Sequence, residues 1–171
     1  MPASRTSFLL LLVTALGWAT PAEALRFRVI NAPPPMLLLS VGSGGSHIDR
    51  VSFKIKSNEL GNGVPVGGKP PVHIIVANRA TPANSRTAVL TADSSVPLLN
   101  DSHSVPLTVI SWTSSDGEIP SGRYDGSGSQ FLLSFTNSQQ IRDKLEFFYD
   151  NTDILKAGTY EGRVTYTLTM P

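Results

Sequence analysis

The last fifteen residues of the chain, 157–171, alternate between apolar and polar positions. From Gly158 onward the apolar residues fall on one face of an extended backbone: Tyr160, Val164, Tyr166, Leu168 and Met170. Period-two alternation with aromatic and β-branched residues is typical of a strand that covers a core on one side. Gly162 lies on the apolar face without a side chain, which predicts a bulge or a close approach by a neighbour. This strand is expected to end beside the carboxyl terminus with its outer edge uncovered, and such edges invite pairing with another chain.

Further short apolar or alternating runs are separated by Gly, Pro, Asn and Ser. The predicted strands are Met36–Val41, Val51–Lys56, Val72–Ala77, Thr87–Ala92, Val105–Trp112, Gln130–Thr136 and Lys144–Tyr149. Ser114–Ser129 is rich in Gly, Ser and Asp and is predicted to be a loop. Helix-forming residues favour a single helical turn at Ser138–Asp143. Many short strands with this punctuation predict an antiparallel all-β sandwich.

A short alternating arm, Leu25–Asn31, precedes these strands. Leu25, Phe27 and Val29 share one face of this arm. Pro33–Pro35 follow and separate the arm from the rest, because proline donates no hydrogen bond and favours a stiff extended backbone. Two interpretations remain open: the arm is short, or Met36–Leu39 is already the first strand of the body.

The first 24 residues have the features of a secretory signal peptide. Arg5 gives a positive start, Phe8–Leu16 is a short apolar run, and Ala22-Glu23-Ala24 has the small-x-small form of a cleavage site. We expect cleavage between Ala24 and Leu25, because the apolar run is too short to cross a bilayer. The predicted organisation is a signal peptide at 1–24, an arm with a proline spacer at 25–35, and one exported domain at 36–171.

Charge and cysteine content narrow the possible partners and sites. The 14 Lys and Arg against 13 Asp and Glu give a net charge of +1, which offers no electrostatic argument for nucleic acid. The sequence contains no cysteine, so disulfides, thiolate metal sites and cysteine catalysis are excluded. An exported domain without disulfides needs either a good core or stabilisation by a partner.

Candidate catalytic and metal-binding residues are scattered. The three histidines lack a short metal-ligand spacing, and Asp116, Glu118 and Asp125 lack the ordered alternation of a calcium loop. No Gly-x-Ser-x-Gly motif is present. We therefore expect a protein that is not an enzyme and that needs no metal or cofactor.

Taken together, these segments resemble a pilus subunit of the chaperone–usher pathway. The stretches Val105–Trp112 and Ala157–Met170 are most similar to the cysteine-free pilins of the alternative, colonisation-factor branch. The resemblance implies an incomplete Ig-like antiparallel β-sandwich that a donor strand completes. It also implies export through the periplasm to a fimbrium on the cell surface. The expected partners are a periplasmic chaperone, an outer-membrane usher, other pilin subunits and a host or surface receptor, and not nucleic acid.

The resemblance also assigns roles to residues in the two terminal segments. Leu25, Phe27 and Val29 would be the side chains that the arm inserts into a neighbouring subunit. The acceptor groove, which also binds the chaperone, would be lined from the C-terminal segment by Gly158, Tyr160, Val164, Tyr166, Leu168 and Met170.

Two other interpretations stay open. The chain could be a monomeric exported β-sandwich that binds carbohydrate or protein through Ser114–Ser129 and neighbouring loops. It could also be a secreted hydrolase. The first of these predicts that the arm folds back on its own body, whereas the pilin interpretation predicts that the arm acts in another molecule.

Overall fold

A computed structural model of the chain describes residues 36–42, 50–79 and 86–171. These residues belong to one compact unit, Pro33–Pro171. The predicted signal peptide, its cleavage site at Ala24 and Leu25, and the arm with Phe27 and Val29 lie outside the described residues. The described part begins at Met36, where the sequence predicts the start of the body.

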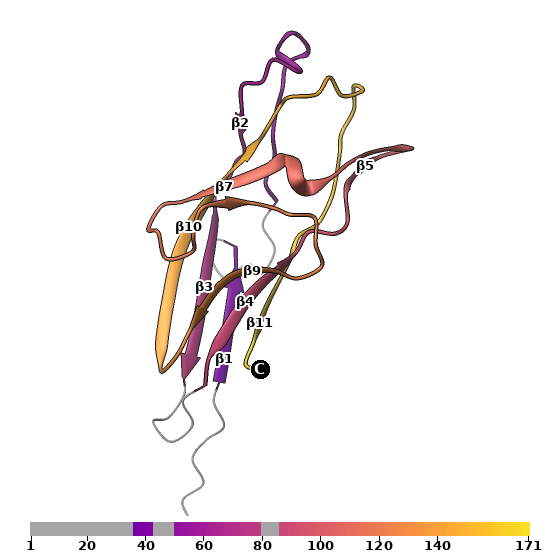
Figure 1. Ribbon diagram of the computed structural model, residues 1–171. Coiled ribbons are helices and arrows are strands. Elements are labelled where there is room, and N and C mark those ends of the chain that lie inside the picture. Colours follow the sequence, from indigo (N-terminus) through magenta and orange to yellow (C-terminus); the bar gives the residue numbers. More distant parts are fainter. Residues whose placement is uncertain (1–35, 43–49, 80–85) are drawn as a thin grey trace, which may run out of the picture. The chain divides into compact units, whose positions relative to one another are not determined.

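The larger of two main sheets has the strand order β1-β3-β10-β7-β8, and β2 also pairs with β10 (Figure 1). Every strand pair in it is antiparallel. Its strands are β1 (Met36–Val41), β2 (Val66–Gly67), β3 (Val72–Arg79), β7 (Ile110–Ser114), β8 (Gly122–Arg123) and β10 (Gln139–Tyr149).

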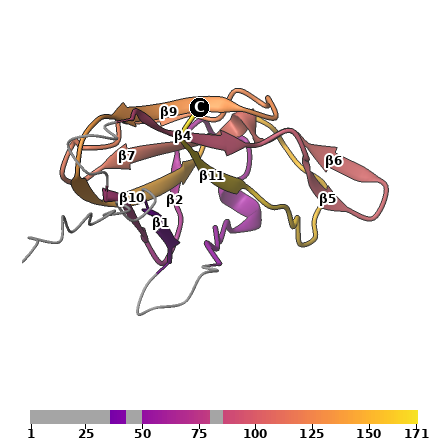
Figure 2. The same ribbon diagram turned by 90° about the horizontal axis from the view of Figure 1, so that it is seen from below.

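A second, three-stranded sheet has the order β11-β4-β9, and Figure 2 shows these strands together from below. It consists of β4 (Ala88–Asp93), β9 (Gln130–Phe135) and β11 (Thr165–Thr169). A separate hairpin joins β5 (Leu98–Asn100) to β6 (His103–Val105), and the only helical segments in the described ranges are the 3-10 turns η1 (Ser57–Glu59) and η3 (Leu107–Val109). The predicted antiparallel all-β sandwich is confirmed.

The hydrophobic core lies between the two main sheets. Ile74 and Val76 on β3 and Leu90 on β4 are all 0% exposed. Trp112 on β7 is also buried, and its indole Nε1 donates a hydrogen bond to the carbonyl oxygen of Pro120 at 2.9 Å. Alternate residues of β3, β4 and β10 point into this core, as the period-two patterns predict.

Part of the strand order matches the immunoglobulin scheme, in which one sheet has the order A-B-E-D and the other contains C, F and G, although β9 beside β4 has no counterpart in that scheme. In chain order, β1, β3, β7 and β10 take the A, B, D and E positions, because β1-β3-β10-β7 are neighbours. Strands β4 and β11 take the C and F positions. The G strand would lie beside β11, and no strand of the described ranges occupies that position.

Four strand predictions agree with the structure to within a residue or two, at Met36–Val41, Val72–Ala77, Thr87–Ala92 and Gln130–Thr136. Because β1 belongs to the larger sheet, Met36–Leu39 is part of the body. The helical turn predicted at Ser138–Asp143 is wrong, since β10 runs unbroken from Gln139. The strand predicted at Val51–Lys56 is reduced to one bridge, between Ser52 and Lys69.

Two other predicted strands are shorter or interrupted. Within Val105–Trp112, η3 separates β6 from β7 directly after Pro106, a residue that cannot donate to a strand ladder. The C-terminal strand begins only at Thr165, and most of the segment before it has no ladder pairing. The predicted loop Ser114–Ser129 is confirmed except for the short strand β8.

A buried carboxylate, Asp143 on β10, holds the loop after β7. Its Oδ2 accepts hydrogen bonds from Ser114 Oγ at 2.6 Å and from the backbone N–H of Ile119 at 2.7 Å. Its Oδ1 accepts the backbone N–H groups of Asp116 and Lys144. The side chain is 3% exposed, and all four of its partners are donors. The loop after β7 is therefore ordered around the buried carboxylate of Asp143, which occupies an inward position where an apolar side chain is usual.

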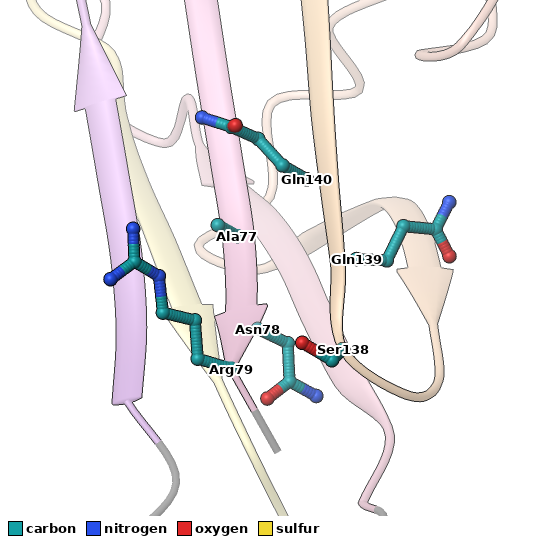
Figure 3. A pocket seen from close by; sticks show the side chains of 6 residues that line it. All are labelled: Ala77, Asn78, Arg79, Ser138, Gln139 and Gln140. Atoms are coloured by element: carbon teal, nitrogen blue, oxygen red, sulfur yellow. The ribbon is translucent and has the colours of Figure 1, made fainter. Parts of the chain in front are cut away.

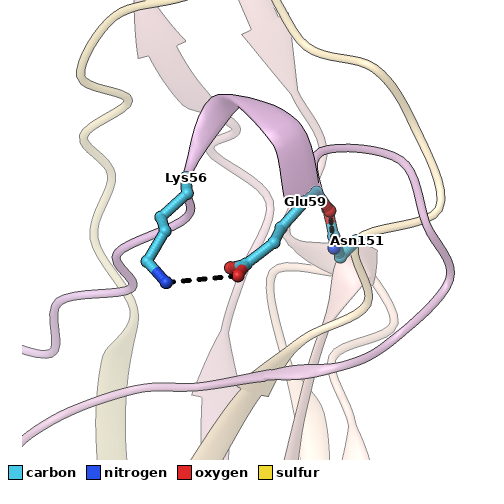
Figure 4. Close-up of polar contacts among 3 residues, drawn as sticks. All are labelled: Lys56, Glu59 and Asn151. Atoms are coloured by element: carbon cyan, nitrogen blue, oxygen red, sulfur yellow. Dashed lines mark hydrogen bonds and ion pairs between the residues drawn. The ribbon is translucent and has the colours of Figure 1, made fainter.

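A second buried polar side chain, Asn151, holds the loop that contains η1 (Figure 4). Its Nδ2 donates to the carbonyl oxygen of Glu59 and to Asn62 Oδ1, each at 2.8 Å, and its Oδ1 accepts the N–H of Gly61 at 3.0 Å. Its φ of 47° is in the left-handed region, which asparagine tolerates better than most residues. The ion pair between Lys56 and Glu59 in the same view is exposed and contributes little.

We expect Asn151→Ala to lower the free energy of unfolding by about 2–4 kcal/mol, because it removes the buried hydrogen bonds and leaves their partners unsatisfied. Asn151→Gly should lose about 1 kcal/mol less, since glycine adopts the positive φ without strain. Urea unfolding followed by fluorescence measures both values. The exposed Asn58→Ala in η1 is the control and should change the free energy by less than about 0.5 kcal/mol. An Asn151→Ala value as small as the control would contradict this role.

Candidate functional site

The candidate site is the edge of the smaller sheet formed by β11. On one side β11 pairs with β4, from Thr165 opposite Asp93 to Thr169 opposite Val89. On its other side, no strand within the described residues forms a ladder with it. On the opposite sheet, β11 contacts β1, which also has a ladder partner on one side only among the described residues, and the two strands lie on the same side of the sandwich (Figures 1 and 2).

Core-facing side chains at this edge are only half buried. Leucine and valine side chains of β1 and apolar side chains of β11 all pack against the core, yet they remain partly exposed. Equivalent side chains on β3 and β4, such as Ile74 and Leu90, are 0% exposed. We call this set the open margin: Leu37, Leu39, Val41, Val164, Tyr166, Leu168 and Met170.

A pair of tyrosines connects the open margin to the core. The hydroxyl groups of Tyr124 and Tyr166 form a hydrogen bond of 2.7 Å. Tyr124 is buried against Trp112 and Phe147, at ring-centroid distances of 4.9 and 6.2 Å. Burial raises the pKa of Tyr166 to about 12, although its bond to Tyr124 opposes this shift. Both hydroxyls therefore stay neutral near pH 7, and the margin carries no charge.

Gly158 and Tyr160 do not lie on β11, which corrects the long strand that the sequence predicts. They belong to the segment before it, which runs along the β5–β6 hairpin. Leu99 and Glu161 exchange two backbone hydrogen bonds, of 2.8 and 3.0 Å. A Cβ on Gly158 would clash with the side-chain amide of Asn100, and one on Gly162 would lie 2.7 Å from Leu98 Cδ2. The close approach predicted at Gly162 is thus confirmed.

The structure brings together four of the six groove residues expected in the C-terminal segment. Val164, Tyr166, Leu168 and Met170 lie in the open margin, and Tyr160 lies instead near Tyr149. The donor residues Leu25, Phe27 and Val29 are outside the described residues. Sequence reasoning missed the β1 side of the margin, because Met36–Leu39 are four apolar residues in a row with no alternation that marks one face. It also missed Tyr124, which stands in a Gly- and Ser-rich loop.

A separate small cavity of about 140 Å³ lies at the end of β3 and the start of β10 (Figure 3). Its lining contains amide, hydroxyl and guanidinium groups from Asn78, Ser138, Gln139, Gln140 and Arg79, together with Ala77. Asn78 Nδ2 donates to the carbonyl oxygen of Arg86 at 3.0 Å. None of these groups is a ready general base or nucleophile near pH 7. The cavity therefore gives no support for catalysis.

Histidine and acidic side chains do not form a cluster in the described ranges. No group of three or more His, Asp or Glu residues there could hold a metal ion. Within the same ranges, no helix has the length and apolar character needed to cross a membrane. The open margin therefore remains the candidate site.

Comparison with protein-family models, with curated proteins and with solved structures gives no match.

Proposed function

We propose that this chain is a structural subunit of a surface pilus, assembled by the chaperone–usher pathway through donor-strand complementation and exchange. The fibre would serve adhesion or biofilm formation. The observation that carries the proposal is the open margin: β11 holds the F position, the G position beside it has no strand in the described residues, and core-facing side chains there are only partly buried.

The arm that precedes the body has the side-chain pattern that a completing strand needs. A strand that completes an antiparallel sheet runs antiparallel to β11 and places alternate side chains against the core. Leu25, Phe27 and Val29 have that spacing. In this proposal they come from a neighbouring subunit and cover the inward side chains of Tyr166 and Leu168, which is β-strand addition.

Burial of the arm's apolar side chains would contribute a free energy comparable to the stability of a whole domain. Three buried apolar side chains at about 1.5–3 kcal/mol each contribute roughly 5–9 kcal/mol. The whole stability of a single domain is about 5–15 kcal/mol. A subunit with an uncovered margin would therefore be marginally stable, so it would need a periplasmic chaperone to cover the margin during export and to deliver it to an outer-membrane usher.

The geometry of such a contact produces a fibre. The arm and the margin are different surfaces of one chain, so their contact is head-to-tail and leaves a free arm at one end and a free margin at the other. Each added subunit extends the polymer, with other pilin subunits as partners and the exposed outer faces available to a receptor.

Deleting Leu25–Asn31 tests the proposal. We expect the chain that retains the arm to form a ladder of head-to-tail multimers in size-exclusion chromatography with light scattering, and the deleted chain to form none. A synthetic peptide of residues 25–31 should then raise the melting temperature of the deleted chain by several degrees, because a ligand that binds only the folded state stabilises it. A peptide with Phe27 and Val29 replaced by Ser is the matched control.

One combined result of this experiment would contradict the proposal. If the chain with the arm is a monomer, and if deletion leaves its melting temperature unchanged, the arm does not act in another molecule. That outcome would favour the monomeric exported sandwich that binds carbohydrate or protein through its loops.

A further inference from the structure

A second surface feature lies on the outer face of the larger sheet, away from its core-facing side. It is a cleft of about 890 Å³ between the segment around Ser52, strand β2 with the residues after it, and the end of β10. We call it the β2–β10 cleft. Its volume is within the range of clefts that bind small ligands. From its lining and charge, we infer that it binds an acidic saccharide, meaning a sugar unit that carries a carboxylate or sulfate group.

The floor of the cleft is an aromatic ring with an uncovered side. Phe148 lies on the outer face of β10, and its partner in the β2 register is Gly67. Because Gly67 has no side chain, nothing from that position covers the ring, and a Cβ placed there would be 4.0 Å from Phe148 Cε1. The part of the Phe148 ring that remains accessible can stack on the C–H face of a pyranose.

The rim of the cleft supplies positive charge. Lys54 and Lys69 both line it, and neither forms an ion pair with any described residue. The acidic residue of the lining, Glu146, is paired with Lys144 at 3.3 Å, so its charge is largely compensated. The cleft thus has two ammonium groups in excess, which suits an anionic group on the ligand.

The remaining polar groups suit a sugar better than a nucleic acid. Ser52 can donate or accept hydrogen bonds, and the carboxylate of Glu146 accepts them. Sugar hydroxyls are both donors and acceptors, so they match these two groups. A DNA backbone has no hydroxyl donors to match the carboxylate of Glu146.

The walls of the cleft are held in place by backbone hydrogen bonds. Ser52 and Lys69 exchange two of them, of 2.8 and 3.0 Å, and Gly68 N–H donates to the carbonyl oxygen of Phe147 at 2.8 Å. The two lysines therefore project from segments that are fixed relative to the Phe148 ring. A preorganised site of this kind loses less entropy when a ligand binds.

Binding of a heparin-derived hexasaccharide to the purified chain, measured by calorimetry at low ionic strength, tests the inference. We expect salt-dependent binding, and at least a tenfold weaker affinity for Lys54→Glu and for Lys69→Glu. Gly67→Val should weaken binding by a similar factor with an unchanged melting temperature, because it fills the space over Phe148 without a backbone clash. A neutral dextran oligosaccharide of equal length should not bind.

Arg86→Glu is the matched control, because it makes the same change in net charge at an exposed position beyond the opposite end of β3. It should weaken binding less than twofold. The inference is overturned if the unaltered chain does not bind the hexasaccharide, if Arg86→Glu weakens binding as much as Lys54→Glu does, if Gly67→Val has no effect, or if a DNA oligonucleotide of equal charge binds more tightly. None of these outcomes depends on whether the chain forms a pilus.

Discussion

Leu168→Asp is expected to abolish head-to-tail multimers, whereas Thr167→Asp on the same strand should leave them intact. Leu168 faces the core from β11 and is half buried in the open margin. An inserted arm would complete its burial, and an unpaired buried carboxylate costs several kcal/mol, which is comparable to the roughly 5–9 kcal/mol that the arm's apolar side chains contribute. Thr167 points away from the core and is exposed, so a carboxylate there stays in water. Size-exclusion chromatography with light scattering at matched concentrations measures the difference.

Folding of the Leu168→Asp variant is checked by circular dichroism and thermal unfolding. If this variant does not fold, Leu39→Asp on the β1 side of the open margin makes the same test from the opposite sheet. If either variant folds and still assembles as the unaltered chain does, the open margin is not the acceptor site.

The largest loss of stability is expected for Asp143→Asn, at about 3 kcal/mol or more, because an amide group would turn an N–H toward two backbone or hydroxyl donors. All four hydrogen bonds to Asp143 come from donors, so a side chain that carries only one acceptor oxygen cannot satisfy them. Urea unfolding at pH 7 measures the loss. Asp116→Asn, an exposed change in the loop that Asp143 holds, should stay within about 0.5 kcal/mol of the unaltered chain.

The pH dependence of stability gives a second measurement for Asp143. Burial raises the pKa of this carboxyl group, but the four donated hydrogen bonds outweigh burial and leave its pKa below the usual value. The stabilisation is therefore complete above the unfolded pKa of about 3.9 and is lost as the pH falls through the folded pKa. We expect the unaltered chain to lose stability on acidification more steeply than Asp143→Asn. Equal slopes would mean that the carboxylate charge contributes little.

The sequence predicts well the strands that appear as a short apolar or alternating run between turn residues, such as β1, β3, β4 and β9. It fails in the first half of β10, because Asp143 puts a polar residue in the middle of the inward face of that strand, whereas the predicted strand Lys144–Tyr149 is confirmed. Such a residue is tolerated only because the distant loop 114–119 supplies three of its four donors, and local composition contains no sign of that loop. Because Asp143 interrupts the alternation, the helix-forming residues Gln139 and Gln140 determine the local prediction.

The opposite error occurs at Val51–Lys56. Val51, Phe53 and Ile55 do pack against the core, as their alternation predicts, but their backbone forms only one bridge. Alternation reports one-sided burial and not ladder pairing, so it cannot distinguish a strand from an extended segment that covers a core. The candidate site shows the same limit: the side chains of β11 were predictable, whereas their neighbours on β1 follow from three-dimensional pairing alone.

The composition of β11 has one more consequence. Natural edge strands are usually guarded by a lysine, a proline or a bulge that blocks stacking of identical chains. The sequence Thr165–Thr169 has none of these residues, and it combines β-branched and aromatic side chains without any charge. Such a segment is suited to cross-β stacking. Under the proposed function, the edge that joins subunits would therefore also be a potential nucleus for amyloid-like aggregates, and productive assembly would depend on covering it faster than copies can stack on one another.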